Sequence, residues 1–296
     1  MEKELKSKKP SAILTSDWHI RESIPICRTD NFWDAQWRKV DFVAGLQRKY
    51  HCPVLHAGDL FDHWKPSPYL LRETMEHLPN RFYTIYGQHD LPNHSLDLKN
   101  KSGISVLEAA EILETMDQCS WGQIPKDISS ICIGHRDHRT LVWHDFTYLG
   151  KEPFPGAKGK AHAKLEKYKQ FDLIVTGDNH QSFTSRGVEG NLLVNPGSLM
   201  RQDADQIDFQ PKVYLWYAED NTVEAVEIPI EKDVVTREHI EKVEQRDERI
   251  DAFVSRMDSN WELTTNFDEN LERFFVLNRV RQQVKNIIWE HKSTTS

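Results

Sequence analysis

The feature that most constrains this chain is a set of polar side chains placed directly after short apolar runs. Each apolar run has the length of a buried strand, and each is followed by side chains that can bind a metal ion. Five such clusters occur: Asp17 and His19 after Ile13-Leu14, Gly58, Asp59 and Asp62 after Val54-Leu55, Gly87 to Asp90 after Thr84-Ile85, His144 after Leu141-Val142, and Gly177 to His180 after Ile174-Val175. The carboxyl ends of strands line the ligand crevice of open α/β sheets, so we expect these five loops to meet in space.

The first two thirds of the chain alternate apolar runs with amphipathic stretches, which is typical of α/β units. The predicted strands are Ala12 to Thr15, Pro53 to Ala57, Phe82 to Tyr86, Ile131 to Ile133, Leu141 to Trp143 and Leu173 to Thr176. Helical spacing of apolar residues predicts helices over Asn31 to Tyr50, Tyr69 to Leu78 and Ile104 to Met116. Between residues 183 and 230 further strands are predicted at Leu192 to Val194, Val213 to Tyr217 and Val223 to Ile228.

After Pro229 the pattern changes to two helical stretches, within residues 240–257 and 271–288. Apolar residues recur there at helical spacing, and Asn266 followed by Glu269 is suited to cap the second stretch. We therefore predict a catalytic domain over residues 1–229 and a helical C-terminal appendage over residues 230–296 that contacts a partner or DNA.

Composition narrows the class of protein. The 296 residues are 38% hydrophobic, enough for a large core, and the charged first ten residues do not form a signal peptide. No segment approaches the roughly 20 apolar residues that span a bilayer, so we expect a cytoplasmic protein with no membrane contact. The four cysteines form no C-x-x-C pair, which argues against a zinc ribbon. A net charge of −8 counts against a general polyanion-binding surface, unless bound cations or a partner supply positive charge.

Each cluster taken singly also has an ordinary structural explanation. An Asp-x-His sequence after a strand is more often a cap or a hydrogen-bonding pair than a metal site. Gly58 to Asp62 would also suit a turn followed by a helix cap, and His144 alone would suit a core histidine. The joint occurrence of the five clusters in this order favours a metal site.

The order and spacing resemble the calcineurin-like metallophosphoesterase family, whose pattern runs D-x-H, G-D-x-x-D, G-N-H-D, a lone H and G-H-x-H. Two positions depart from it, because Gln88 stands where the family has Asn and Asp178 where it has the first His of the last motif. The resemblance implies a four-layer α/β/β/α metallophosphoesterase sandwich followed by a helical appendage.

The resemblance also implies two divalent metal ions. The residues expected to hold them are Asp17, His19, Asp59 and His180 for the first ion, and Asp59 as a bridge with Gln88, His144 and Asp178 for the second. Both departures fall on the second ion and keep an oxygen donor. Hard oxygen ligands favour Mn²⁺, with Mg²⁺ as the alternative, over softer ions.

The same resemblance implies the chemistry. Two cations about 3.5 to 4 Å apart can activate a water and stabilise charge on the attacking and leaving oxygens of a phosphoester. His89 would lie near the leaving group as a general acid or charge stabiliser. Asp90 would accept the other N–H of that ring and orient it.

The motifs give the reaction class and leave the substrate open. Asp17-Trp18-His19, residues 88–95, Asn195 to Ser198 and the helical tail resemble phage and bacterial SbcD-type DNA-repair nucleases. That resemblance implies a DNA exonuclease or endonuclease subunit of repair or recombination, which works with an SbcC-like coiled-coil ATPase and could also form a homodimer. The alternatives are a nucleotide phosphodiesterase or phosphomonoesterase and, in another class, a catalytically inactive structural subunit.

Overall fold

The computed structural model describes residues 8–116, 138–258 and 266–293. The predicted strand Ile131 to Ile133 lies outside the described residues. The chain divides into two compact units, Met1–Thr236 and Arg237–Ser296. The functional assignment of residues 1–229 and 230–296 to a catalytic domain and an appendage stays a prediction.

Two β-sheets form the centre of the first unit. The larger has the strand order β10-β9-β1-β2-β3-β4, with β1 (Ala12–Thr15), β2 (Val54–His56), β3 (Phe82–Thr84), β4 (Glu114–Thr115), β9 (Lys212–Tyr217) and β10 (Thr222–Glu227). The smaller has the order β5-β6-β8-β7, with β5 (Thr140–Trp143), β6 (Leu173–Thr176), β7 (Phe183–Arg186) and β8 (Leu192–Asn195). Strands β1, β2 and β3 are parallel, as are β5 and β6, so the loops that follow them open at one edge of each sheet.

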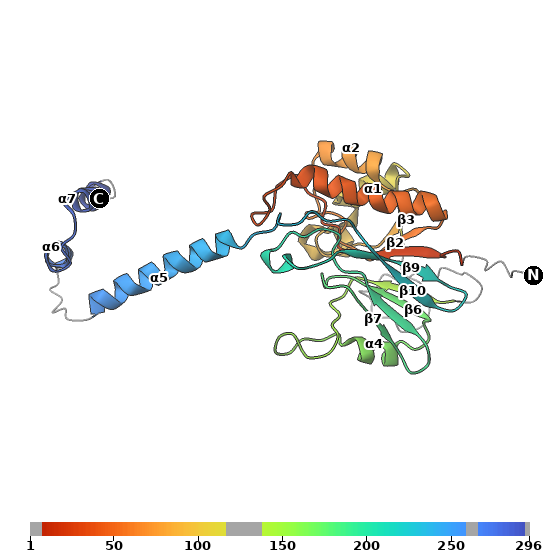
Figure 1. The fold of residues 1–296 in the computed structure, drawn as a ribbon. Coiled ribbons are helices and arrows are strands. Elements are labelled where there is room, and N and C mark those ends of the chain that lie inside the picture. The colour runs from red at the N-terminus through yellow and green to blue at the C-terminus, as the bar shows by residue number, and fades with distance from the viewer. Residues whose placement is uncertain (1–7, 117–137, 259–265, 294–296) are drawn as a thin grey trace, which may run out of the picture. The chain divides into compact units, whose positions relative to one another are not determined.

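Helices cover the outer faces of the two sheets (Figure 1). The larger sheet packs against α1 (Phe32–Tyr50), α2 (Pro68–His77) and α3 (Gly103–Ala109), and the smaller against α4 (Ala161–Lys167). Three apolar clusters fill the spaces between these four layers. Ile13 of β1 packs in the cluster that contains α1, whereas Leu14 packs between the sheets, as the alternation of side chains along a strand requires. The predicted α/β/β/α arrangement is confirmed.

Helix α1 illustrates how the sequence specifies these elements. The Asn31 side chain accepts a hydrogen bond from the Asp34 N–H and caps the N-terminus, and the helix ends at His51, which has a φ of 54°. Between these ends Trp37, Val40 and Val43 are buried against the sheet. Burial of each such side chain contributes about 1.5 to 3 kcal/mol.

Two sequence-based expectations differ from this unit. The predicted helix Ile104 to Met116 is wrong in its second half, because α3 ends at Ala109, Glu111 has a φ of 57° and residues 114–115 form β4. The apolar pattern does not predict strand β7, since its residues are only partly buried at the end of the smaller sheet. Short 3₁₀ helices span Pro92–His94, Leu96–Lys101 and Ala204–Gln206.

The second unit consists of helices α5 (Glu238–Asp258), α6 (Phe267–Leu277) and α7 (Gln282–Ser293). Asn266 caps α6 as predicted, by accepting a hydrogen bond from the Asp268 N–H. The second predicted helical stretch is divided into α6 and α7, because Arg279 adopts a left-handed backbone with φ 49°. Across the described residues, none of the helices combines the length and the apolar character that a membrane span requires.

Candidate metal centre

The predicted metal ligands lie on loops with an unusual backbone. Asp17, His19, Asp59 and Asp178 have φ values of 50°, 45°, 57° and 70°. Aspartate and histidine enter this left-handed region more readily than most residues other than glycine. The Asp17 and His19 N–H groups donate to the carbonyls of Gly58 and Asp59, each at 3.0 Å, so the loops after β1 and β2 are tied together.

Four predicted ligands of the first metal come together. The ligand atoms of Asp17, His19 and His180 all lie within 4.8 Å of one another. His19 Nε2 lies 3.2 Å from His180 Nε2, 3.9 Å from Asp17 Oδ1 and 3.8 Å from Asp59 Oδ2. Carboxylates and imidazoles that converge in this way form a typical binding site for a divalent cation.

Asp59 also faces the residues predicted for the second metal. His144 Nε2 lies 3.1 Å from Asp59 Oδ2, and His144 Nδ1 lies 2.7 Å from the Ala57 carbonyl oxygen. Because a carbonyl only accepts, Nδ1 carries the proton and donates it, which leaves the Nε2 lone pair directed at the carboxylate. In the neutral ring two acceptor atoms therefore face each other, across a distance that suits either a shared proton or a shared cation.

The two positions that depart from the family pattern lie beside each other. Gln88 Nε2 donates to Asp178 Oδ1 at 2.5 Å, and the Asp178 N–H donates to Asp17 Oδ1 at 3.0 Å. The structure thus pairs the side chains of Gln88 and Asp178 with each other, and the Asp178 backbone joins this pair to the cluster at Asp17. Each brings an oxygen atom, which suits a hard cation.

Two atoms of the cluster provide a test of whether the residues fit a metal ion. Asp17 Oδ2 and His144 Nε2 are buried and have no hydrogen-bond partner among the described residues. Burying a polar group without a partner is costly, and such atoms are rare in folded proteins. A divalent cation would satisfy a carboxylate oxygen and an imidazole lone pair together, so the residues present fit the metal.

The pKa values of the clustered side chains also indicate that a positive charge stabilises the cluster. Burial raises the pKa of Asp17 and lowers the pKa of His19 to about 3. Burial also opposes the charged form of His144, yet the Asp59 carboxylate outweighs it and raises the His144 pKa to about 10. Without a cation, a proton on His144 is the charge that stabilises the Asp59 carboxylate.

Glycines let the loops approach this closely. Gly58 has a φ of 92°, and a Cβ atom there would lie 2.6 Å from His144 Nδ1. A Cβ atom at Gly87 would lie 2.1 Å from Asp59 Oδ1. Any larger residue at either position would displace a metal ligand.

His89 lies at the open side of the cluster. Its ring centroid is 4.8 Å from that of His19, and its backbone N–H donates to Asp59 Oδ1 at 2.8 Å. His89 Nδ1 donates to the Asp62 carbonyl at 2.9 Å, which fixes the ring and leaves Nε2 as its proton acceptor. The side chain is exposed, as a group that contacts substrate must be.

The role predicted for Asp90 is wrong in one respect. The Asp62 carbonyl, rather than the Asp90 carboxylate, accepts the N–H of the His89 ring. The fully buried Asp90 carboxylate accepts backbone N–H groups of Leu60, Phe61 and Gly87 at 3.2, 3.0 and 3.0 Å. Asp90 therefore ties the loops after β2 and β3 together and acts through the position of these loops.

Sequence reasoning missed several residues around the cluster. A hollow beside His89 is also lined by Arg21 and Asp203. Arg21 NH1 lies 3.1 Å from Asp62 Oδ1, and Asp203 Oδ2 lies 3.8 Å from His180 Nδ1. Neither residue belongs to a motif of its own, so only the folded loops show that they are part of the site.

Comparison with known proteins agrees with the motifs. The sequence profile of the calcineurin-like phosphoesterase superfamily domain matches residues 11–213, which include every loop described above. The chain belongs to this superfamily. As a calcineurin-like phosphoesterase, it is a member of a family of metal-dependent hydrolases of phosphoesters. Comparison with curated proteins gives no match.

Solved structures with similarity to this calcineurin-like phosphoesterase chain include three examples. A novel archaeal phosphodiesterase is 15% identical, with 73% of this chain and 99% of that chain covered and a TM-score of 0.43. A metallophosphoesterase from Sphaerobacter thermophilus is 13% identical, with 74% and 88% covered and a TM-score of 0.37. A single mutant of Vps29 from Entamoeba histolytica is 13% identical, with 74% and 99% covered and a TM-score of 0.33.

Proposed function

We propose that this chain is a two-metal phosphodiester hydrolase that cuts DNA. The observation that carries the hydrolase is the convergence of five side chains from four loops, with Asp17 Oδ2 and His144 Nε2 buried and unpartnered among the described residues; the five are Asp17, His19, Asp59, His144 and His180. The residues that would hold the metals are Asp17, His19, Asp59 and His180 for one, and Asp59, Gln88, His144 and Asp178 for the other. When bound, two divalent cations lower the pKa of a water molecule and neutralise charge on phosphate oxygens.

The chain's own contribution to the reaction centres on His89. The Asp62 carbonyl holds the ring in one tautomer, and the adjacent His19 ring limits its position. Protonated at Nε2, His89 would donate a proton to the oxygen that leaves phosphorus, and the neutral ring would then take up a proton from solvent. His144, held by the Ala57 carbonyl, would instead keep its Nε2 lone pair directed at the metal site.

We propose Mn²⁺ as the metal, with Mg²⁺ as the alternative, because Gln88 and Asp178 both present oxygen atoms. The test is a double substitution, Gln88→Asn with Asp178→His, which introduces an imidazole at the second position. Imidazole is a softer ligand than carboxylate, so the expected result is a shift of the metal preference towards Zn²⁺ or Co²⁺ with two ions still bound. An unchanged Mn²⁺ dependence would contradict this reasoning.

DNA is the substrate we propose, supported by the resemblance of the loops and tail to SbcD-type nucleases. A second hollow beside the cluster is lined by Gln88, His144 and His94, whose Nδ1 lies 3.1 Å from the Gln88 carbonyl oxygen. A DNA backbone could extend into this hollow on one side of the cluster. Elsewhere in the same unit, Lys158 and Lys160 are exposed, and their positive charge would attract the phosphates of a DNA backbone.

The C-terminal helices are the proposed contact with a partner. In this unit Val276, Leu277, Val284, Ile287 and Ile288 are exposed apolar side chains. Val284, Ile287 and Ile288 have the i, i+3 and i+4 spacing that puts side chains on one face of a helix, and an exposed apolar face usually marks a protein interface. The partner we propose is an SbcC-like coiled-coil ATPase in the cytoplasm, with a homodimer as the alternative occupant.

The decisive experiment compares cleavage rates on single-stranded DNA, double-stranded DNA and a small phosphodiester, with Mn²⁺ and with Mg²⁺. His89→Ala should lower DNA cleavage about 10²- to 10⁴-fold while metal uptake, measured by calorimetry, stays at two ions. His162→Ala, a substitution of an exposed histidine on α4, is the matched control.

The outcomes separate the alternatives. Cleavage of the small phosphodiester without any cleavage of DNA, with or without a partner, would favour a nucleotide phosphodiesterase. Uptake of fewer than two ions together with no hydrolysis of either substrate would favour a structural subunit.

A further inference from the structure

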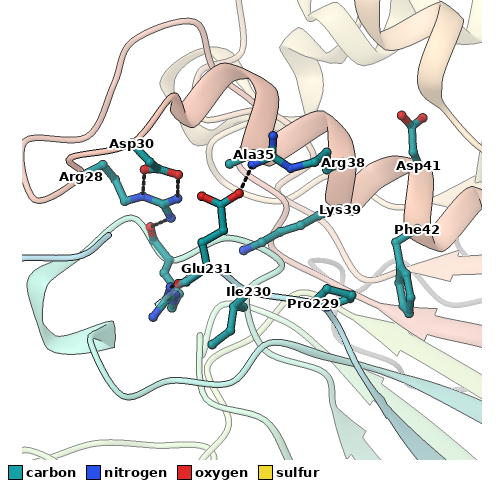
Figure 2. A pocket seen from close by; sticks show the side chains of 11 residues that line it. Arg28, Asp30, Ala35, Arg38, Lys39, Asp41, Phe42, Pro229, Ile230 and Glu231 are labelled. Carbon is teal, nitrogen blue, oxygen red and sulfur yellow. Dashed lines mark hydrogen bonds and ion pairs between the residues drawn. The ribbon is translucent and has the colours of Figure 1, made fainter. Parts of the chain in front are cut away.

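A separate hollow lies between α1 and the segment that follows β10 (Figure 2). It has a volume of about 450 Å³, and none of the described residues that line it belongs to the metal centre. Its charged lining consists of Arg28, Arg38, Lys39, Arg201, Asp30 and Glu231, with Asp41 at one end. The established family activity gives this hollow no role.

Positive charge exceeds negative charge in the buried part of this lining. Arg28, Lys39 and Arg201 are 8%, 6% and 3% exposed. Of these, Arg28 forms a two-pronged ion pair with Asp30, with N–O distances of 2.8 and 2.6 Å. Lys39 donates to the Leu199 carbonyl at 3.2 Å, and Arg201 donates to two backbone carbonyls. In the part of the chain that the structure describes, two buried cations therefore have only neutral hydrogen-bond partners, which is costly unless an anion joins them.

Hydrogen-bond donors remain available in the same place. Arg201 Nε is buried and has no acceptor among the described residues. Lys39 uses one of its three donors in the bond to Leu199, and Figure 2 shows its amine directed into the hollow. Burial, together with the nearby charges of Arg28 and Arg201, lowers the pKa of Lys39 to about 7.

The rim and the wall of the hollow indicate the size of the ligand. Arg38, at the rim, pairs with Glu231 at 2.6 Å, and both side chains are 56% exposed, so this pair can open towards solvent. Phe42, Pro229 and Ile230 form an apolar wall. The volume exceeds that of one small inorganic anion, so an organic group attached to the anion also fits.

We infer that this hollow binds a phosphate group, either free or carried by a small organic molecule. A phosphate group presents several acceptor oxygens and up to two negative charges, which match the unpartnered Arg201 Nε–H, the Lys39 amine and, once Glu231 releases it, Arg38 at the rim. The apolar wall would take the planar group of a mononucleotide. This inference is independent of the proposed function, because it uses no residue of the metal centre.

The test is a calorimetric titration of the full chain with orthophosphate and, separately, with a nucleoside monophosphate. Metals are first removed with a chelator, so that phosphate cannot bind at a metal ion. We expect one equivalent of at least one probe to bind. Glu231→Gln should strengthen binding about fivefold, because it removes a negative charge from the rim and releases Arg38.

Two lysine variants complete the design. Lys39→Met keeps the length of the side chain and removes its charge, and should weaken binding about tenfold or more. Lys49→Met changes an exposed lysine on the same helix and should leave affinity unchanged.

Equal or tighter binding of the monophosphate than of orthophosphate would assign the site to a phosphorylated organic molecule, and binding of orthophosphate alone would assign it to free phosphate. Failure of both probes to bind would overturn the inference. An unchanged affinity in Glu231→Gln would also overturn it, since this exposed substitution does not disturb core packing. If Lys39→Met does not fold, the comparison of Glu231→Gln with Lys49→Met decides the question.

Discussion

Replacing Asp90 with asparagine tests whether this residue supports the loops or takes part in the reaction. The Asp90 carboxylate is fully buried and accepts three backbone N–H groups, with Oδ2 shared between Leu60 and Gly87 and Oδ1 bonded to Phe61. Asparagine has a single acceptor oxygen, so its NH₂ group must face at least one of these N–H groups.

The magnitude follows from this count. A buried donor left without an acceptor costs about 1 to 3 kcal/mol. Burial raises the pKa of Asp90 to about 7, so above pH 7 the remaining bonds also lose the strength that a charged acceptor provides. We expect Asp90→Asn to lower the free energy of unfolding by about 2 to 4 kcal/mol. Urea denaturation of the metal-free chain, followed by circular dichroism, measures this change.

Asp62→Asn is the matched control, because it makes the same chemical change in the same region. The Asp62 carboxylate is 30% exposed and pairs with Arg21, so its loss should cost under about 1 kcal/mol. The backbone carbonyl that holds His89 is unaffected. A stable Asp90→Asn protein with a strongly reduced kcat would refute the supporting role and restore a direct role in catalysis.

Three further predictions concern the metal centre and its surroundings. His144→Ala should reduce bound Mn²⁺ from two ions to one and lower phosphodiester cleavage at least about 100-fold, as metal analysis and rates would show. Mn²⁺ at about 100 times its Kd should raise the unfolding free energy by about 2.7 kcal/mol for each ion bound, and a chelator should reverse the shift in Tm. Burial lowers the pKa of His56 from 6.5 to about 3. The contribution of His56 to the free energy of unfolding is therefore fully present above pH 6.5 and is lost at about 1.4 kcal/mol per pH unit as the pH falls towards 3. In denaturation experiments, His56→Gln should make the free energy of unfolding less dependent on pH in this range.

Most of the first unit follows from local patterns in the sequence. Apolar runs such as Ala12 to Thr15 and Leu173 to Thr176 form strands with the predicted bounds, because both faces of these strands are buried. The errors fall where one residue decides the course of the chain. The left-handed backbone at Glu111 ends a helix that the apolar spacing would continue, and Arg279 divides α6 from α7 in the same way.

The candidate site is predictable to the extent that strand ends determine it. Asp17 and Asp59 follow neighbouring parallel strands of one sheet, so their proximity can be expected from topology. His144 follows a strand of the other sheet, so its place in the cluster also depends on how the two sheets pack. The contacts of Asp90 could not be expected, because its carboxylate binds backbone N–H groups. Every residue except proline has such a group, so the sequence does not indicate which ones Asp90 binds. Lys39 and Arg201 are likewise far apart in the sequence, and no spacing rule connects them.

The left-handed backbone of the metal loops limits how this site can change during evolution. At Asp17, His19, Asp59 and Asp178, a strained conformation that costs about 1 to 3 kcal/mol restricts the tolerated residues mainly to Asp, Asn, His and Gly. Asp178, where the family has histidine, still belongs to this small set of tolerated residues. Longer ligands such as glutamine are accommodated at positions with ordinary backbone, as Gln88 illustrates, so the two kinds of position can draw on different sets of metal ligands.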